Sequence, residues 1–254
     1  MGIGFIGTGG ITTAIVTGLC TAEAPPQEIW VSPRNRHHAA RLESEFEPVH
    51  VGPSNQAVLD RADLVVLAVL PQHKEEILEP LAFGRDQTII HLLAGVRIEE
   101  IAPLVAPAAD IVRAVPLPCT AIHQGPIAIY PDHERANAFF GSLGTVVPTD
   151  QEAQLETLSI ITALMAPYYA LMEQVVAWAA EEGIQRDKAA VYTASMFGAL
   201  SAIAASFPGG QIQSLVSDSM TPGGLNELAM SIINDRKGFE SLTEALGQVK
   251  GKIG

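Results

Sequence analysis

The feature that most constrains the fold of this chain is a glycine-rich turn near its amino terminus. The run Ile3-Gly-Phe-Ile6 reads as a short apolar strand, Gly7-Thr-Gly9 follows it, and a helix is predicted over residues 10–21. Gly7 allows the tight turn from strand into helix, Gly9 lets the backbone approach a phosphate, and free N–H groups at the helix start face negative charge. This geometry predicts a pyrophosphate site for a dinucleotide, with contacts from Gly7, Thr8, Gly9, Gly10 and Ile11.

The third small position of the usual G-x-G-x-x-G/A pattern is Thr12, so the pattern is imperfect and weak when taken alone. Its context strengthens it, because a predicted strand precedes the turn, a predicted helix follows it, and a second strand is predicted next. A glycine-rich turn in some other α/β protein is the alternative interpretation.

Apolar runs alternate with helical segments through the first part of the chain, which is typical of a parallel sheet covered by helices. The predicted strands are 2–6, 28–32, 47–51, 64–69, 87–92, 110–115, 126–129 and 144–147. The predicted helices between them are 10–21, 34–45, 54–60, 72–81, 97–104 and 132–142. From residue 149 onward the chain consists of long helical segments. We therefore predict an α/β domain over 1–148 and an all-helical domain over 149–254.

The chain has 254 residues and a formal net charge of −13, so nucleic acid and an anionic membrane are not expected as main partners. No signal-peptide pattern is found, and polar residues interrupt the apolar stretches before the ~20 residues that a membrane span needs. A cytoplasmic protein is therefore expected. The two cysteines and seven histidines show no metal-ligand spacing, and no metal site is predicted.

The predicted helix at Lys188–Phe207 carries few charges over about five turns, so little of its circumference can face water. Burial against a second subunit is the simplest explanation, and a homodimer or higher homo-oligomer is expected. A large core within one subunit is the alternative.

The residues after the second predicted strand indicate which nucleotide binds. Ser32-Pro-Arg34-Asn-Arg36 contains no Asp or Glu that would accept hydrogen bonds from both ribose hydroxyls, which favours NADP(H) over NAD(H). Ser32 and Arg34 are placed to donate to the 2′-phosphate, with Arg36 assisting, because a guanidinium presents several donors in a fixed fork. Alternatively, the arginines only solvate a helix start.

Turns after three further predicted strands lie at the sheet edge where open α/β folds bind ligands. They are expected to flank the cofactor through Ala68, Val69, Pro71, Ala94 and Pro116.

With these motifs in place, the chain resembles the pyrroline-5-carboxylate reductase family almost end to end. The opening I-G-F-I-G-x-G matches, and Asn55 stands where the family has an adenosine-contacting asparagine. Leu67–Gln72 resembles the A-V-K-P-Q segment, Ile89–Val96 the I-I-S-x-x-A-G-I segment, and Arg113–Pro116 the R-x-M-P segment. In the helical half, Pro167 and Tyr169 fit the G-S-G-P-A-Y helix start, and Thr221-Pro-Gly-Gly224 fits the S-P-G-G-T-T turn.

The resemblance implies an NADPH-binding Rossmann domain joined to a helical dimerisation domain, with hydride transfer to the carbon of a cyclic C=N bond. The family uses its glycine turn to hold the substrate carboxylate and the second threonine to bond the ring nitrogen. Carried over, Thr221, Gly223 and Gly224 bind the carboxylate and Asn226 contacts the nitrogen. Thr221 and Asn226 are thus the predicted catalytic residues.

The sequence departs from the family mainly in the substrate half. Leu70 replaces the lysine of A-V-K-P-Q, Leu117 replaces an asparagine, Leu225-Asn226 replace the two threonines, and His91 replaces a small residue. These changes predict a pocket lined by Leu117, Leu164, Met165 and Leu225 and a bulkier or less polar substrate. Packing around an ordinary proline-forming site is the alternative.

The expected function is NADPH-dependent reduction of pyrroline-5-carboxylate or a related imine. One alternative is a protein like the deazaflavin-dependent NADP oxidoreductases, which should lack the Thr-Pro-Gly-Gly turn. Another is a non-catalytic NADP-binding sensor or scaffold.

Overall fold

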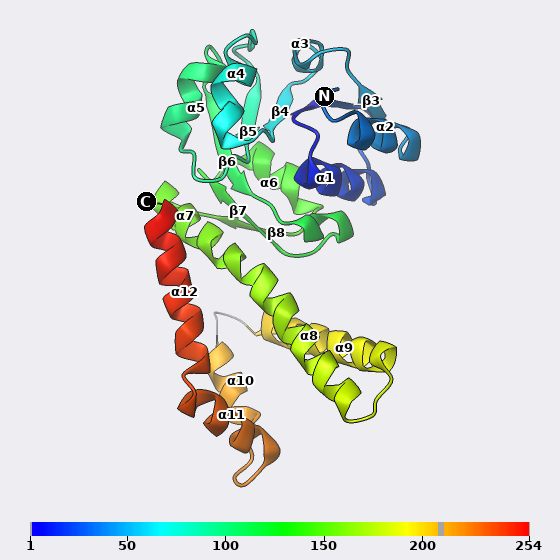
Figure 1. The fold of residues 1–254 in the computed structure, drawn as a ribbon. Coiled ribbons are helices and arrows are strands. Elements are labelled where there is room, and N and C mark those ends of the chain that lie inside the picture. Colours follow the sequence, from blue (N-terminus) through cyan, green and yellow to red (C-terminus); the bar gives the residue numbers. More distant parts are fainter. Residues whose placement is uncertain (1, 208–210, 254) are drawn as a thin grey trace. The chain divides into compact units, whose positions relative to one another are not determined.

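A computed structural model describes residues 2–207 and 211–253 of the chain (Figure 1). The chain divides into two compact units, Met1–Ser159 and Ile160–Gly254. The first unit contains a sheet of eight strands in the order β3-β2-β1-β4-β5-β6-β7-β8. The strands are β1 (Ile3–Ile6), β2 (Ile29–Val31), β3 (Val49–Val51), β4 (Leu64–Leu67), β5 (Thr88–His91), β6 (Asp110–Val115), β7 (Pro126–Tyr130) and β8 (Thr145–Pro148).

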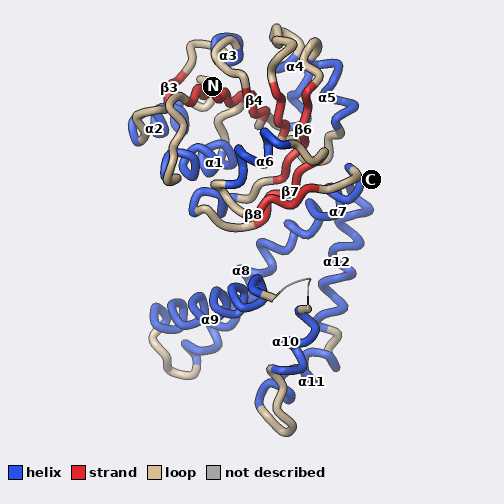
Figure 2. The backbone as a smooth tube through the Cα atoms, turned by 180° about the vertical axis from the view of Figure 1, so that it is seen from behind, coloured by secondary structure: helices blue, strands red, loops and turns tan. Residues whose placement is uncertain are grey.

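Helices cover both faces of this sheet (Figures 1 and 2). They are α1 (Gly10–Thr21), α2 (Arg36–Glu45), α3 (Asn55–Leu59), α4 (Lys74–Leu78), α5 (Ile98–Val105) and α6 (Glu134–Gly141), with short 3₁₀ helices η1 (Pro71–His73) and η2 (Pro118–Ile122). All six predicted helices and eight predicted strands of this part are confirmed, with ends shifted by a few residues.

The alternation of side chains along the strands produces two separate cores. Phe5 and Val66 point to the face covered by α1, α2 and α6, whereas Ile6 and Leu67 point to the face covered by α3, α4 and α5. Successive side chains of a strand lie on opposite faces, so a strand buried on both sides must be apolar throughout. This is why Leu64–Leu67 has no polar residue.

The sheet departs from the all-parallel arrangement that the sequence predicts at one pair of strands. β6 and β7 are antiparallel, with Arg113 opposite Tyr130, while the other neighbouring strands are parallel. A parallel pair needs a long crossover connection, usually a helix. Only η2 and short loops lie between Val115 and Pro126, so the chain reverses direction there.

The described residues of the second unit form helices joined by turns, and none of them forms a strand. The unit contains the end of α7 (Glu152–Ile161), the 3₁₀ helix η3 (Thr162–Leu164), α8 (Met165–Glu181), α9 (Arg186–Ser206), α10 (Ile212–Asp218), α11 (Leu225–Asp235) and α12 (Gly238–Ile253). Gly183, with φ +90°, joins α8 to α9, and the Tyr168 and Phe197 rings contact each other edge to face. The 3₁₀ helix η3 interrupts the helical run before α8, and Pro167 sits in the first turn of α8, where its missing N–H costs nothing.

The predicted division after residue 148 differs from the observed units because α7 is grouped mainly with the sheet. Glu152 of α7 accepts a hydrogen bond from the buried Arg113 of β6 at 2.9 Å, and Glu156 accepts one from Arg97 at 3.1 Å. The assignment of the two domains to cofactor binding and to dimerisation stays a prediction.

Two helical stretches are long and apolar enough to cross a membrane when judged by length and composition alone. They are Glu152–Glu181, with mean hydropathy 1.3, and Arg186–Ser206, with mean hydropathy 1.4. The expectation that polar residues interrupt every apolar run before that length was therefore wrong. Only 11% of each apolar window is buried inside the chain.

Candidate functional site

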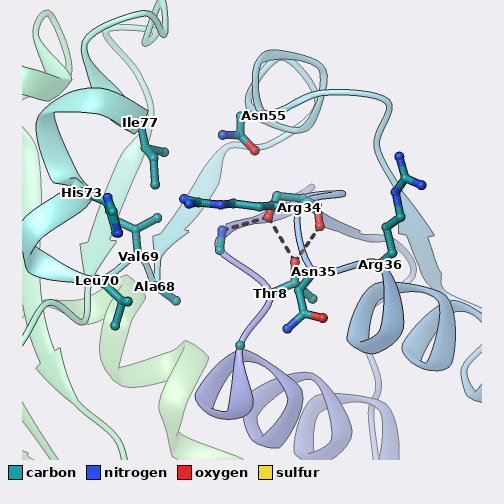
Figure 3. A pocket seen from close by; sticks show the side chains of 13 residues that line it. Thr8, Arg34, Asn35, Arg36, Asn55, Ala68, Val69, Leu70, His73 and Ile77 are labelled. Atoms are coloured by element: carbon teal, nitrogen blue, oxygen red, sulfur yellow. Dashed lines mark hydrogen bonds between the residues drawn. The ribbon is translucent and has the colours of Figure 1, made fainter.

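A cavity lies where the strand order reverses, between β1 and β4. The loops after β1, β2 and β4 meet at the carboxyl ends of these strands, which is where open α/β sheets bind ligands. They enclose a cavity of about 620 Å³, within the range of cofactor sites (Figure 3). Its lining residues are Gly7, Thr8, Gly9, Ser32, Arg34, Asn35, Arg36, Asn55, Ala68, Val69, Leu70, His73 and Ile77.

The glycine turn is tied to the neighbouring strand by side chains. Gly7 has φ +102°, and an added Cβ would lie 2.4 Å from the Ala68 carbonyl oxygen, so only glycine fits. The Gly7 N–H donates to Ser32 Oγ at 2.9 Å, and Thr8 Oγ1 donates to the Ser32 carbonyl at 2.7 Å. Ser32 lines the cavity but is 1% exposed. The structure thus gives Ser32 the role of fixing the turn, and its predicted role as a phosphate donor stays a prediction.

The start of α1 presents unsatisfied N–H groups to the cavity edge. Gly9 is the N-cap, no side chain caps the helix, and the first turn contains no acidic residue. The first N–H groups of a helix have no partner within the helix and carry partial positive charge. An added Cβ at Gly9 would meet nothing within 4 Å, so this face is open toward a ligand. Thr12 is compatible with the motif because its buried Oγ1 donates to the Gly7 carbonyl at 2.6 Å.

The loop after β2 supplies the cations of the cavity. Figure 3 shows the Arg34 side chain reaching across the cavity below Asn55, whereas Arg36 points to the other side. Within residues 2–207 and 211–253, the Arg34 guanidinium has no hydrogen bond or ion pair. Asn55 is the first residue of α3, whose N-cap Ser54 accepts a hydrogen bond from the Ala57 N–H. None of the lining residues is acidic, although the whole chain carries a net charge of −13.

Three lining residues were missed as candidates from the sequence. Asn35 caps α2 by accepting from the His38 N–H at 3.3 Å, and His73 and Ile77 come from the segment after β4. Leu70, from the same segment, is 60% exposed and stands where the family motif has a lysine. Asn35 has a sequence signal, because Asn before a helix is a preferred N-cap. His73 and Ile77 have none, since only the tertiary fold brings them to this cavity.

Five predicted cofactor residues do not line the cavity: Gly10, Ile11, Pro71, Ala94 and Pro116. Gly10 and Ile11 are the first residues of α1, and Pro71 begins η1 beside the lining residue Leu70. Pro116 is buried and follows β6, while Ala94 is exposed after β5. Their roles stay predictions.

His91 and Arg113 form a buried polar pair behind this edge of the sheet. They are register partners, His91 at the end of β5 and Arg113 within β6, and they are 0% and 2% exposed. Arg113 is ion-paired with Glu152 and Glu156, but neither ring nitrogen of His91 finds a hydrogen-bond partner among the described residues. Burial first and the charge of Arg113 second lower the pKa of His91 to about 3. His91 does not line the cavity, so nothing in its position supports a catalytic role.

The buried His91 predicts a loss of stability in acid. The imidazole of His91 takes up a proton near pH 6.5 in the unfolded chain but only near pH 3 in the folded chain. The free energy of unfolding therefore decreases as the pH is lowered from 6.5 toward 3. The slope is at most about 1.4 kcal/mol per pH unit for one proton. A His91→Leu variant should lose this part of the slope in urea titrations, whereas exposed His37→Gln should keep it. An equally steep slope in His91→Leu would contradict the prediction.

The Thr221–Gly224 turn lies in the second unit and directly precedes α11. Gly223 has φ +75°, Gly224 is the N-cap of α11, and the Gly224 N–H donates to the Thr221 carbonyl at 2.7 Å. The Asn226 side-chain amide donates to the Ser219 carbonyl at 2.9 Å. The assignments of Thr221, Gly223, Gly224 and Asn226 to substrate binding and catalysis stay predictions, as does the apolar lining by Leu117, Leu164, Met165 and Leu225.

Among the residues that the structure describes, no group of three or more His, Cys, Asp or Glu side chains is placed to hold a metal ion. Burial raises the pKa of the Cys20 thiol to about 11, which makes it a poor nucleophile.

The fold and the cavity define a dinucleotide-binding protein of the Rossmann type with an appended helical unit. Residues 2–95 match the family described as NADP oxidoreductase coenzyme F420-dependent. A pyrroline-5-carboxylate reductase of Pseudomonas aeruginosa is 25% identical, over 95% of this chain and 91% of the relative. The chain is thus similar to pyrroline-5-carboxylate reductases over nearly its whole length.

Solved structures are similar over the same length. A 1-pyrroline-5-carboxylate reductase from Streptococcus pyogenes superposes with a TM-score of 0.85 at 22% identity, covering 100% of this chain and 98% of the other. The Plasmodium falciparum pyrroline carboxylate reductase with NADP bound has a TM-score of 0.84 at 16% identity, covering 100% and 97%. These likenesses support the two-part fold.

Proposed function

We propose that this protein is an NADPH-dependent reductase that transfers a hydride to a cyclic imine, either pyrroline-5-carboxylate, which becomes proline, or a related imine. The observation that carries the proposal is the cavity at the switch point of the sheet. It combines the glycine turn, the open start of α1 and the unpaired Arg34, with no acidic lining residue. Relatives similar over nearly the whole chain are pyrroline-5-carboxylate reductases, which supports the reaction class.

The residues of the cavity fit the parts of NADPH. The open backbone at Gly9 and the free N–H groups of α1 suit the pyrophosphate. The Arg34 guanidinium suits the 2′-phosphate, and Asn55 lies beside it to contact the adenosine (Figure 3). Ala68 and Val69 directly follow β4 and lie beside Gly7. They would line the path from the pyrophosphate toward the reactive ring of NADPH.

When bound, NADPH supplies a hydride to the imine carbon while the nitrogen takes a proton, so that the C=N bond becomes C–N and NADP⁺ is released. A protonated imine is already a good electrophile. The task of the protein is therefore to position it and to exclude water. No strongly perturbed acid or base is required for this step.

The apolar helices of the second unit support a homodimer or a higher homo-oligomer. Large apolar side chains are exposed along α8 and α9, including Trp178 at 62% and Tyr192 at 73%. Exposed apolar area on this scale marks an interaction surface. Glu173 near the middle of α8 pairs with Arg186, and such charges suit a subunit interface better than a lipid environment. We therefore propose a cytoplasmic oligomer and no membrane partner.

Turnover assays test the proposed function directly. The purified protein should consume NADPH when pyrroline-5-carboxylate or a cyclic imine is added, followed by the loss of NADPH absorbance. Tight NADPH binding without turnover of any imine in a panel would instead identify a non-catalytic NADP-binding sensor or scaffold.

A second candidate function is motivated by the family match over residues 2–95, whose description names coenzyme F420. That match covers the cofactor part only, whereas the curated relatives extend across the helical part and its Thr221–Gly224 turn. Reduction of an oxidised deazaflavin by NADPH, in the absence of any imine reduction, would favour this candidate.

A further inference from the structure

The carboxylate of Glu227 binds the glycine turn, Thr221–Gly224, that precedes α11. The Gly223 N–H donates to Glu227 Oε2 at 2.6 Å, a short bond of the charge-assisted kind. Glu227 is the third residue of α11, from which a glutamate side chain characteristically reaches back to the N–H groups before the helix. The negative charge therefore lies at the positive end of the helix, where it is most stabilised.

Two further donors in and beside this turn are also engaged. The Gly224 N–H donates to the Thr221 carbonyl at 2.7 Å, and the Asn226 side-chain amide donates to the Ser219 carbonyl at 2.9 Å. The Gly223 and Gly224 N–H groups, which the resemblance assigns to a substrate carboxylate, and the Asn226 amide, which it assigns to the nitrogen, thus have partners inside the second unit. An incoming carboxylate would have to displace Glu227 and then lie close to its charge, and like charges at such a site repel.

We propose that Glu227 determines the substrate class, so that the enzyme reduces imines that carry no carboxylate in preference to pyrroline-5-carboxylate. The inference rests on the proposed function, because it takes the Thr221–Gly224 turn as part of the substrate site. The charge of Glu227 also favours the protonated, cationic form of an imine, which is the form that accepts hydride. Leu225 beside it is 86% exposed and offers an apolar surface to such a substrate.

The test compares 1-pyrroline with pyrroline-5-carboxylate, which has the same ring with a carboxylate added. We expect the wild-type protein to have a higher kcat/KM for 1-pyrroline. Glu227→Gln, which keeps the size and removes the charge, should shift the ratio of the two kcat/KM values at least about tenfold toward pyrroline-5-carboxylate, mainly through KM. Glu244→Gln on α12 is the matched control and should leave the ratio unchanged.

The outcomes separate this inference from the function on which it rests. A wild-type preference for pyrroline-5-carboxylate, or a ratio that Glu227→Gln leaves unchanged, overturns the role of Glu227 while the reductase activity stands. No turnover of either imine by a protein that binds NADPH overturns the proposed function and this inference with it. Since Glu227 is exposed, Glu227→Ala provides a second variant, in which loss of the hydrogen bond and of the charge should give a shift in the same direction.

Discussion

Replacing Gly7 with alanine is expected to destabilise the first unit severely, because two independent features of this position require glycine. Its φ of +102° is unfavourable for residues with a side chain, and the new Cβ would lie 2.4 Å from the Ala68 carbonyl oxygen. Ala68 cannot move away easily, since its N–H donates to the Ile6 carbonyl at 2.8 Å within the sheet. We expect a loss of at least about 2 kcal/mol in the free energy of unfolding, measured by urea denaturation.

Gly9→Ala is the matched control, two residues along the same turn. Gly9 has φ −95° and ψ −166°, which alanine adopts without strain, and its Cβ would meet nothing within 4 Å. The free energy of unfolding of the Gly9→Ala variant should stay within about 1 kcal/mol of the wild-type value, because the only loss is that alanine is a poorer N-cap than glycine. NADPH binding should nevertheless weaken at least about tenfold, because the Cβ projects where the pyrophosphate is proposed to lie. Wild-type NADPH affinity in Gly9→Ala would contradict this placement of the cofactor.

Arg34→Ala is expected to weaken NADPH binding by about 10- to 100-fold, the loss that corresponds to hydrogen bonds between charged groups worth about 1.5–3 kcal/mol. NADH has no 2′-phosphate, so its affinity should change by less than about threefold. Titration calorimetry with both nucleotides measures the two effects on one preparation. Arg34 has no hydrogen bond or ion pair with any other described residue, so its removal should leave folding unaffected.

Arg36→Ala separates a specific contact from a general effect of positive charge. Both arginines line the cavity, but Figure 3 shows that only Arg34 extends across it. A smaller loss of NADPH affinity in Arg36→Ala than in Arg34→Ala is therefore expected. Equal losses for NADPH and NADH in Arg34→Ala would remove this account of cofactor choice.

Much of the first unit was predictable because its signals are local. A strand buried on both faces must be apolar along its whole length, as Leu64–Leu67 is, and a turn with positive φ selects glycine, as at Gly7. The order of such elements restricts the topology to a few arrangements. The reversal of β7 was missed although the short connection from Val115 to Pro126 is visible in the sequence.

Part of the site was not predictable because its residues meet only through tertiary contacts. His73 and Ile77 lie more than 60 residues from the glycine turn in the chain, and the parallel pairing of β1 with β4 brings them to the same cavity. The second role of Ser32, as the acceptor for the Gly7 N–H, likewise depends on the pairing of β1 with β2. A motif names the residue types that a cofactor needs, but it does not reveal which of them the fold uses to hold itself together.

By itself, the sequence determined the alternating α/β pattern, the helical second part, the glycine turn and the basic loop at Arg34, because each depends on side chains close together in the chain. Only the tertiary structure decided that His91 is buried beside Arg113 and that Glu227 occupies the Gly223 N–H. The reason is physical. Burial and hydrogen-bond pairing depend on which groups share a location after folding, and neither strand period nor glycine preference specifies that.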